Sequence, residues 1–328
     1  MELSRIRNSF KFKRIQIEMN EGIDFKATEK AVDQIRKVRK DSGISDEFGL
    51  RIGVKGGGCS GYTYSLGFDK ELRAEDSVIE ISGVNDKGVT YNVVYMNRGG
   101  SGNRIKAKYL AAKGNDGTTV PYRYANWSVG KDMIVVSSAG YMDEYGTPVG
   151  LTIDNGKVVN RTLASFDGLI IVYATGGIVA TNLKNGDLTL QGGGISAGRK
   201  FDIRNNYTDR MDFINWAQLQ EATVFQTHLL VYKNQLTIGS NADTKSRERR
   251  FLAVGKDKAS GDVCHVIVNL PEYTTLYNGS VRAKKFLNDI RDIEVTFMIN
   301  LDTGIQDVCF LYNSDGTINS LIHGEKPI

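Results

Sequence analysis

Residues 49 to 69, GLRIGVKGGGCSGYTYSLGFD, join two alternating apolar runs through a glycine-rich loop. The alternating apolar positions are Leu50, Ile52 and Val54 before the loop, and Tyr62, Tyr64, Leu66 and Phe68 after it. Because successive side chains of a strand point to opposite faces, both runs predict half-buried strands of one hairpin. The loop holds four glycines, Cys59 and a serine, which is more than a tight turn needs. Its open backbone suits either a metal or cluster ligand, or an inherited loop whose chemistry has been lost.

A helix is predicted directly before this hairpin, over residues 28 to 41. Thr28 can cap it, Glu29 suits the positive N-terminal end, and Gly43 is placed to end it. The apolar stripe of this helix consists of Ala31, Val32, Ile35 and Val38. One helix and one hairpin make a small α+β unit.

The rest of the chain reads differently from about residue 84 onward. Asn/Gly-rich turns separate many short apolar runs, including an Asn-Gly hairpin turn at 155 and 156. Helical patterns occur only at 211–219 and 280–290. With 328 residues, 36 glycines and 41% hydrophobic residues, the chain suits two globular domains built mainly from strands. The expected fold class is α+β: a small helix-plus-hairpin unit followed by a larger β-rich mixed α/β domain.

The charge of +4 is concentrated at the N-terminus, where the first 14 residues carry five Lys or Arg and one Glu. We expect residues 1–25 to form a basic arm, residues 26–86 the small domain and residues 87–328 the larger one. Such an arm suits docking onto an acidic protein surface, and nucleic acid is not expected as a partner. The sequence has no apolar stretch of 18 residues and no signal-peptide pattern, so we expect neither a membrane span nor general export.

Three cysteines and three histidines give little support for a metal site. Cys59, Cys264 and Cys309 are far apart, and no histidine pair has the i, i+4 spacing of a zinc site. His265 follows Cys264, but neighbours on a strand point to opposite faces. The glycines of RGGSGNR at 98–104 lack the Lys-Ser/Thr of a phosphate-binding loop, so a plain turn is expected.

The helix TEKAVDQIRKVRK and the run LRIGVKGGGCSGYTYSLGFD resemble the A-type iron–sulfur carrier (HesB-like) family over about residues 26 to 84. That resemblance implies that Cys59 is a ligand of a cluster or of iron. The family's second motif, a Cys-Gly-Cys near the C-terminus, is absent, so the domain is truncated. A cluster normally takes four thiolates, and the other ligands would have to come from other chains. We expect no resident cofactor unless Cys59 is completed in this way.

A second resemblance covers about residues 88 to 322. The segments SSAGYMDEYGTPVGLTIDNGKVV, FQTHLLVYKNQ, RERRFLAVGKD and MINLDTG follow, in order, the pattern of phosphodiester glycosidase-like domains. This resemblance implies a catalytic site around Asp302, which matches a loop aspartate of that family. Ser138 stands where the family has asparagine, and His228 stands where it has proline. Arg250 lies one residue before the family's arginine position.

These departures bear on catalysis, because cleaving a sugar–phosphate linkage needs an acid, a base or nucleophile, and donors for the phosphate. Our leading hypothesis is therefore a structural or interaction component of a large assembly, with a bacteriophage tail or baseplate as the best analogy. Its partners would be other protein subunits, and its location the virion or the cytoplasm. The alternatives are a phosphodiester glycosidase acting on a glycan, with Asp302, Arg250, His228 and Ser138 in its site, and an iron–sulfur or iron-binding protein using Cys59.

Overall fold

The computed structural model has mostly strands and few helices, which agrees with the α+β class. It describes residues 15–17, 37–39, 41–45, 48–56, 62–69, 77–78, 81–86, 89–96, 105–111, 117–186, 188–190, 192, 194–196, 198–304, 308–312 and 318–323. The chain divides into two compact units. The first comprises residues 1–81 with 313–317, and the second comprises residues 82–312 with 318–328.

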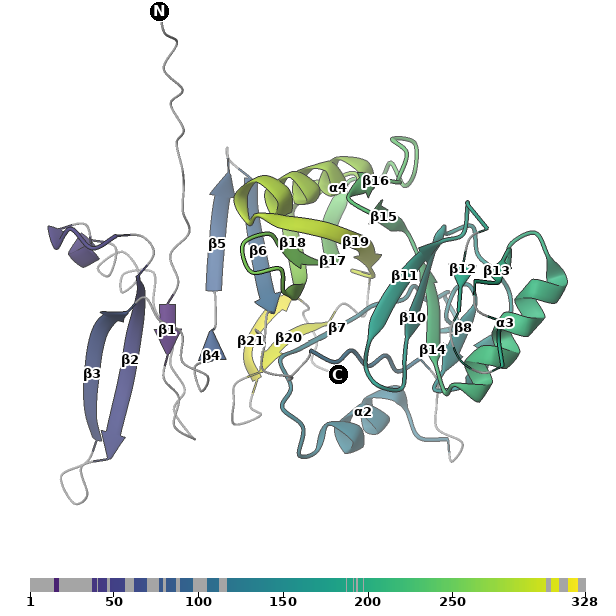
Figure 1. The fold of residues 1–328 in the computed structure, drawn as a ribbon, viewed down its shortest axis with the longest axis horizontal. Helices are drawn as coiled ribbons and strands as arrows, with labels where there is room; N and C mark the ends of the chain where they lie inside the picture. Colours follow the sequence, from purple (N-terminus) through teal and green to yellow (C-terminus); the bar gives the residue numbers. More distant parts are fainter. Residues whose placement is uncertain are drawn as a thin grey trace, which may run out of the picture. The chain divides into compact units, whose positions relative to one another are not determined.

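The first unit contains a four-stranded sheet in the order β3-β2-β1-β4 (Figure 1). Its strands are β1 (Ile15–Ile17), β2 (Gly49–Gly56), β3 (Tyr62–Asp69) and β4 (Ser77–Val78). The hairpin expected from the alternating runs is confirmed: β2 and β3 pair antiparallel from Gly49 opposite Asp69 to Gly56 opposite Tyr62. Cys59 and its loop lie outside the described residues. Strand β1 falls within the stretch that we assigned to a basic arm, and it pairs in parallel with β2.

The end of the helix before this hairpin is also described. Residues 37–39 are helical, and Gly43 has a φ of +62°, a left-handed conformation that glycine adopts without steric cost. The Ile44 N–H donates to the Arg39 carbonyl (3.0 Å), which satisfies a carbonyl of the last turn. Gly43 therefore ends the helix as expected, while most of the helix lies outside the described residues.

The second unit is built around a seven-stranded antiparallel sheet and a five-stranded one, with orders β16-β15-β19-β17-β18-β6-β5 and β11-β10-β14-β8-β9. A three-stranded sheet (β21-β20-β7) and a two-stranded one (β12-β13) complete it. The strands are β5 (Ile81–Asp86), β6 (Val89–Met96), β7 (Val135–Ser137), β8 (Thr152–Asp154), β9 (Lys157–Asn160), β10 (Gly168–Val172), β11 (Ile178–Asn182), β12 (Leu188–Thr189), β13 (Lys200–Phe201), β14 (Thr223–Thr227), β15 (Leu229–Tyr232), β16 (Gln235–Leu236), β17 (Arg247–Asp257), β18 (Val263–Thr274), β19 (Ile293–Leu301), β20 (Cys309–Tyr312) and β21 (Ile318–His323).

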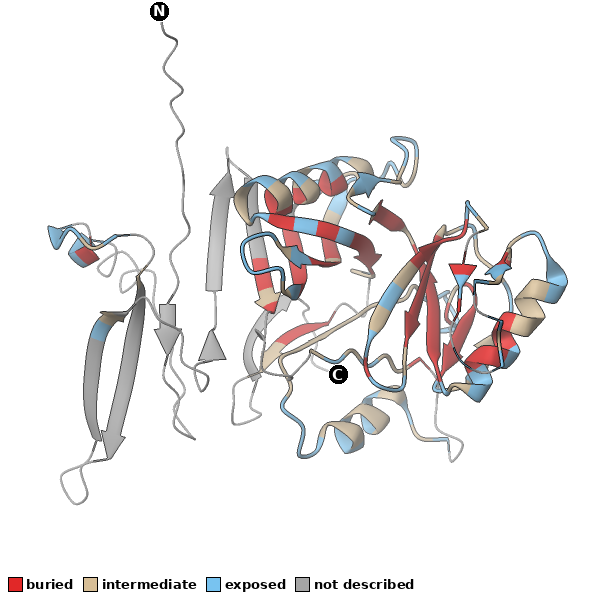
Figure 2. Ribbon diagram, in the orientation of Figure 1, coloured by how far each residue is buried: buried red, intermediate tan, exposed pale blue. Residues whose placement is uncertain are grey.

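The helices of this unit are α2 (Val120–Ser128), α3 (Tyr207–Leu219) and α4 (Leu276–Lys285), which continues as a π-helical turn over Phe286–Ile290. The last two correspond to the two predicted helical segments, each beginning a few residues earlier than expected. Helix α2 was not predicted. It has a Thr119 cap and a proline in its first turn, but none of its residues is buried (Figure 2).

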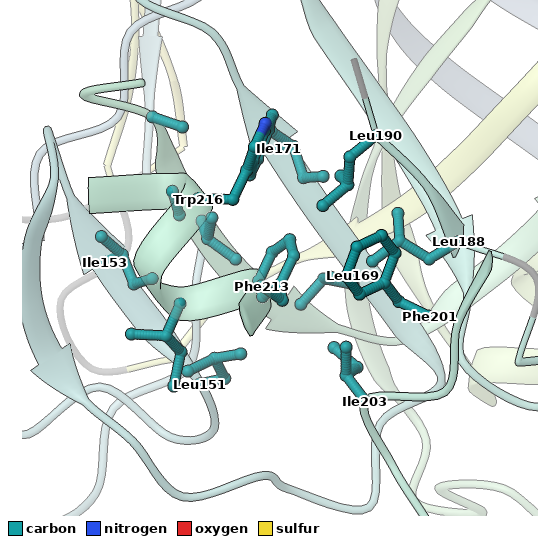
Figure 3. Packing of buried hydrophobic residues seen from close by; sticks show 14 of the residues in the cluster. Leu151, Ile153, Leu169, Ile171, Leu188, Leu190, Phe201, Ile203, Phe213 and Trp216 are labelled. Carbon is teal, nitrogen blue, oxygen red and sulfur yellow. The ribbon is translucent and has the colours of Figure 1, made fainter. Parts of the chain in front are cut away.

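The five-stranded sheet separates two apolar cores, and its inner strand β10 alternates between them. Leu169 and Ile171 face α3 and pack with Phe213 and Trp216 (Figure 3). Ile170 points the other way and packs with residues of β15, β17 and β19 from the seven-stranded sheet. The two large sheets therefore pack face to face, and the chain crosses between them at one residue, His228, which separates β14 from β15.

Helix α4 lies close to the seven-stranded sheet. A Cβ atom on Gly279 would come within 3.0 Å of the Thr274 side chain and 3.2 Å of the Phe251 ring, so a larger residue would have to displace these neighbours. Among the residues described, no helix has both the length and the apolar character that a membrane crossing requires.

Candidate functional site

Two of the predicted catalytic residues, Ser138 and Arg250, meet at the backbone of Val308. The Ser138 N–H donates to the Val308 carbonyl (2.8 Å), and the Val308 N–H donates to the Ser138 hydroxyl oxygen (2.9 Å). The Arg250 Nη1 group donates to the same Val308 carbonyl (3.2 Å). Both side chains thus bond to Val308, the residue before β20, and Arg250 ties it to β17 of the seven-stranded sheet.

Arg250 is completely buried, with 0% of its surface exposed. It lies on β17 opposite Asn269 of β18, and its Nε donates to the Asn269 side-chain oxygen at 2.6 Å. Only the alternative glycosidase hypothesis places this guanidinium in a substrate site. In the structure it lies inside the fold, with donors directed at Asn269 and at the backbone of Val308.

Asp302 follows the last residue of β19 and is half-buried. Its N–H donates to the Ala139 carbonyl (3.0 Å), and its carboxylate accepts the Gly304 N–H (3.0 Å). These bonds join the loop after β19 to the loop that contains Tyr141. The negative charge of Asp302 adds to burial, the larger cause, in raising the pKa of Tyr141.

His228 lies at the crossing between the two large sheets and packs among aromatic rings. Its imidazole is 4.7 Å from the Phe166 ring and 6.0 Å from the Tyr141 ring, measured between centroids. Burial is the largest effect on the pKa of His228 and lowers it, while Asp243 and Asp167 act in the opposite direction. The imidazole is therefore neutral near pH 7.

Tyr141 and Asn300 complete this cluster and were missed in the sequence. Asn300 is 3% exposed, and its Nδ2 group donates to the Tyr141 hydroxyl and to the Leu301 carbonyl (3.0 Å). The Tyr141 and Phe166 rings lie 5.0 Å apart. A signal was present in both cases: Asn300 is a lone amide in the apolar run TFMINL, and Tyr141 belongs to the first segment of the glycosidase-like resemblance. We call Tyr141, Phe166, His228 and Asn300 the aromatic–amide cluster.

A metal centre finds no support within the described ranges, which contain no group of three or more His, Cys, Asp or Glu side chains able to hold an ion. Cys264 and Cys309 are both buried and free of disulfide bonds. Burial is the main cause that raises the pKa of Cys264 to about 11, so its thiol is protonated at neutral pH and does not suit a cluster. Cys59 lies outside the described residues.

Comparison with curated proteins supports an A-type carrier-like region in this chain. An Aquifex aeolicus protein is 41% identical over 73 residues, which are 22% of this chain and 62% of that protein. The iron–sulfur cluster insertion protein ErpA of Hahella chejuensis is 39% identical over 57 residues, 17% of this chain and 48% of ErpA. SufA of Bacillus subtilis is 44% identical over 57 residues, 17% of this chain and 47% of SufA. This chain therefore spans about half to three fifths of the length of these relatives.

The solved structures give weaker likenesses. The catalytic domain of zebrafish N-acetylglucosamine-1-phosphodiester alpha-N-acetylglucosaminidase is 15% identical, with a TM-score of 0.36 over 83% of this chain and 75% of that domain. A hypothetical Synechocystis protein is 10% identical, with a TM-score of 0.37 over 84% of this chain and 65% of that protein. Scores this low carry no argument about activity. No family model matches the chain.

Proposed function

We propose that this chain is a structural or interaction component of a larger protein assembly, and that its glycosidase-like region does not catalyse hydrolysis. The observation that carries the proposal is the position of Arg250. An arginine that binds a substrate phosphate must present its guanidinium to solvent, whereas Arg250 is 0% exposed and donates to Asn269 and Val308. We take a virus particle, in particular a bacteriophage tail or baseplate, as the class of assembly to test first.

Ser138 supports the same proposal from the other side of Val308. Its hydroxyl oxygen accepts the Val308 N–H, and its own backbone N–H is bonded to the Val308 carbonyl. A serine held in this way reinforces a loop, because its hydroxyl oxygen already accepts a backbone N–H of the protein. Asp302 is the one carboxylate among the four predicted catalytic residues, which is fewer than the two groups used to cleave a glycosidic bond.

The test combines two measurements on the full chain. Purified protein is incubated with a chromogenic sugar–phosphate diester beside the Asp302→Ala variant, and the native source is fractionated by particle size. We expect no difference in turnover between the two proteins, and the native chain in a particle much larger than 36.2 kDa. Hydrolysis that Asp302→Ala abolishes while the fold survives would establish the alternative, a phosphodiester glycosidase with Asp302, His228, Arg250 and Ser138 in its site.

A second candidate function is binding of iron or an iron–sulfur cluster through Cys59, with further ligands from other chains. The similarity to the cluster insertion protein ErpA favours it. Anaerobic purification from the native source, with iron analysis and a visible spectrum, tests it directly. Bound iron with thiolate charge-transfer bands that disappear in Cys59→Ser, but persist in the control Cys264→Ala, would support this function. Iron-free protein would exclude it.

A further inference from the structure

Asn300 carries a buried acceptor that no described residue satisfies. Its Nδ2 group uses both protons, one on the Tyr141 hydroxyl and one on the Leu301 carbonyl. Its Oδ1 atom accepts no hydrogen bond within the described part of the chain, although the residue is only 3% exposed. Buried polar atoms are nearly always paired, so an unpaired one marks a place where a partner group fits.

The Tyr141 hydroxyl next to it offers a hydrogen-bond donor, whereas Asn300 Oδ1 offers an acceptor. Its oxygen accepts the Asn300 Nδ2 proton, and its own proton has no acceptor among the described residues. Since Nδ2 and Oδ1 share one carbon, the pair presents an acceptor and a donor close together. A ligand that offers one donor and one acceptor at the same short separation would satisfy both atoms.

Aromatic rings lie beside the pair. The rings of Phe166, His228 and Tyr141 are half-buried and pack at centroid distances of 4.7 to 6.0 Å. The charges that act on Tyr141 are the Asp302 carboxylate and the Arg249–Asp243 ion pair, whose members lie 2.9 Å apart. Planar groups pack well against such rings, whereas an anion would be repelled by the Oδ1 atom and by Asp302.

We infer that the aromatic–amide cluster binds a neutral amide group of a partner polypeptide, whose N–H donates to Asn300 Oδ1 and whose carbonyl accepts from the Tyr141 hydroxyl. An amide is planar and carries this donor and acceptor on neighbouring atoms. The source is an Asn or Gln side chain, or a peptide bond, of another subunit, and this part rests on the proposed function. Asn300 is covered while the rings are half-exposed, so this binding requires one ring to turn aside.

Nuclear magnetic resonance on the full-length, isotope-labelled chain tests this inference with acetamide as the probe. We expect saturable shifts of the Asn300 side-chain amide and of the His228 ring nitrogens. N,N-dimethylacetamide, which keeps the carbonyl and lacks the N–H, should bind about fivefold to tenfold more weakly, the worth of one neutral hydrogen bond. This comparison needs no variant. Tyr141→Phe should weaken acetamide binding by a similar factor, and Tyr207→Phe, on the exposed end of α3, should not change it.

Two results would overturn the inference: no saturable shift with acetamide, or a response to methyl glucoside as strong as the response to acetamide, which would make the cluster a saccharide site. A failure of the proposed function would give a different combination of results. A chain that resides in a large particle without hydrolysing the diester, yet ignores acetamide, overturns only the inference. A chain that binds acetamide but hydrolyses the diester overturns only the proposed function.

Discussion

Replacing Arg250 with methionine tests whether this arginine stabilises the fold or binds a substrate. Methionine keeps much of the side-chain volume but removes the donors to the Asn269 side chain (2.6 Å) and the Val308 carbonyl (3.2 Å). Hydrogen bonds from a charged donor contribute about 1.5–3 kcal/mol each. Removing the buried charge also removes its desolvation penalty, which offsets part of the lost hydrogen-bond energy. We therefore expect the free energy of unfolding to fall by about 2–4 kcal/mol.

Urea unfolding followed by circular dichroism measures this loss from the midpoint at constant slope. Arg247→Met is the matched control, because Arg247 lies on the same strand with its side chain 45% exposed and an ion pair to Asp243. Exposed pairs of this kind contribute about 0–1 kcal/mol. If Arg250→Met costs no more than this control, the arginine does not hold β17 to Val308, and the argument against a catalytic role fails.

Three further predictions concern stability. Burial lowers the pKa of His228 and of His265 from the ordinary 6.5, so the unfolded chain binds more protons and stability should fall as pH drops below that value; equal urea midpoints at about pH 8 and about pH 5.5 would contradict this. Gly279→Ala should cost about 1–3 kcal/mol by thermal unfolding, because its Cβ meets β17 and β18, while Gly67→Ala, with open space around it, should cost less. Asn206→Ala should cost about 1 kcal/mol, since its side chain caps α3.

Much of the secondary structure could be predicted from local patterns. The β2–β3 hairpin follows from the period-two alternation on either side of the glycine loop, and the Asn155-Gly156 turn joins β8 to β9 as expected. Helix α2 was missed because it is short and buries no residue, although Thr119 and the proline in its first turn are start signals. Strand β1 was missed because three residues beside a run of basic ones carry too little periodic signal.

The candidate site was predictable only in part, because its contacts join distant segments. Tyr141 and Asn300 are 159 residues apart, and only the packing of the two large sheets brings them together. Arg250 shows the same limit. Its place in a family-like motif left its role open, because what a strand position faces depends on the segment that packs over the sheet, here Val308 at the start of β20.

The strand order of the seven-stranded sheet determines how long β6 remains without its neighbour strand during synthesis. Met96 of β6 pairs with His265 of β18, so the β5–β6 segment has to wait for about 170 further residues before its neighbour strand exists. At roughly 5–20 residues per second, that interval is roughly ten to thirty seconds. During this interval, one edge of β6 stays unpaired outside the ribosome. An unpaired strand edge can pair with other chains. The demand for protection by chaperones therefore falls on this early segment, long before the late strands complete the sheet.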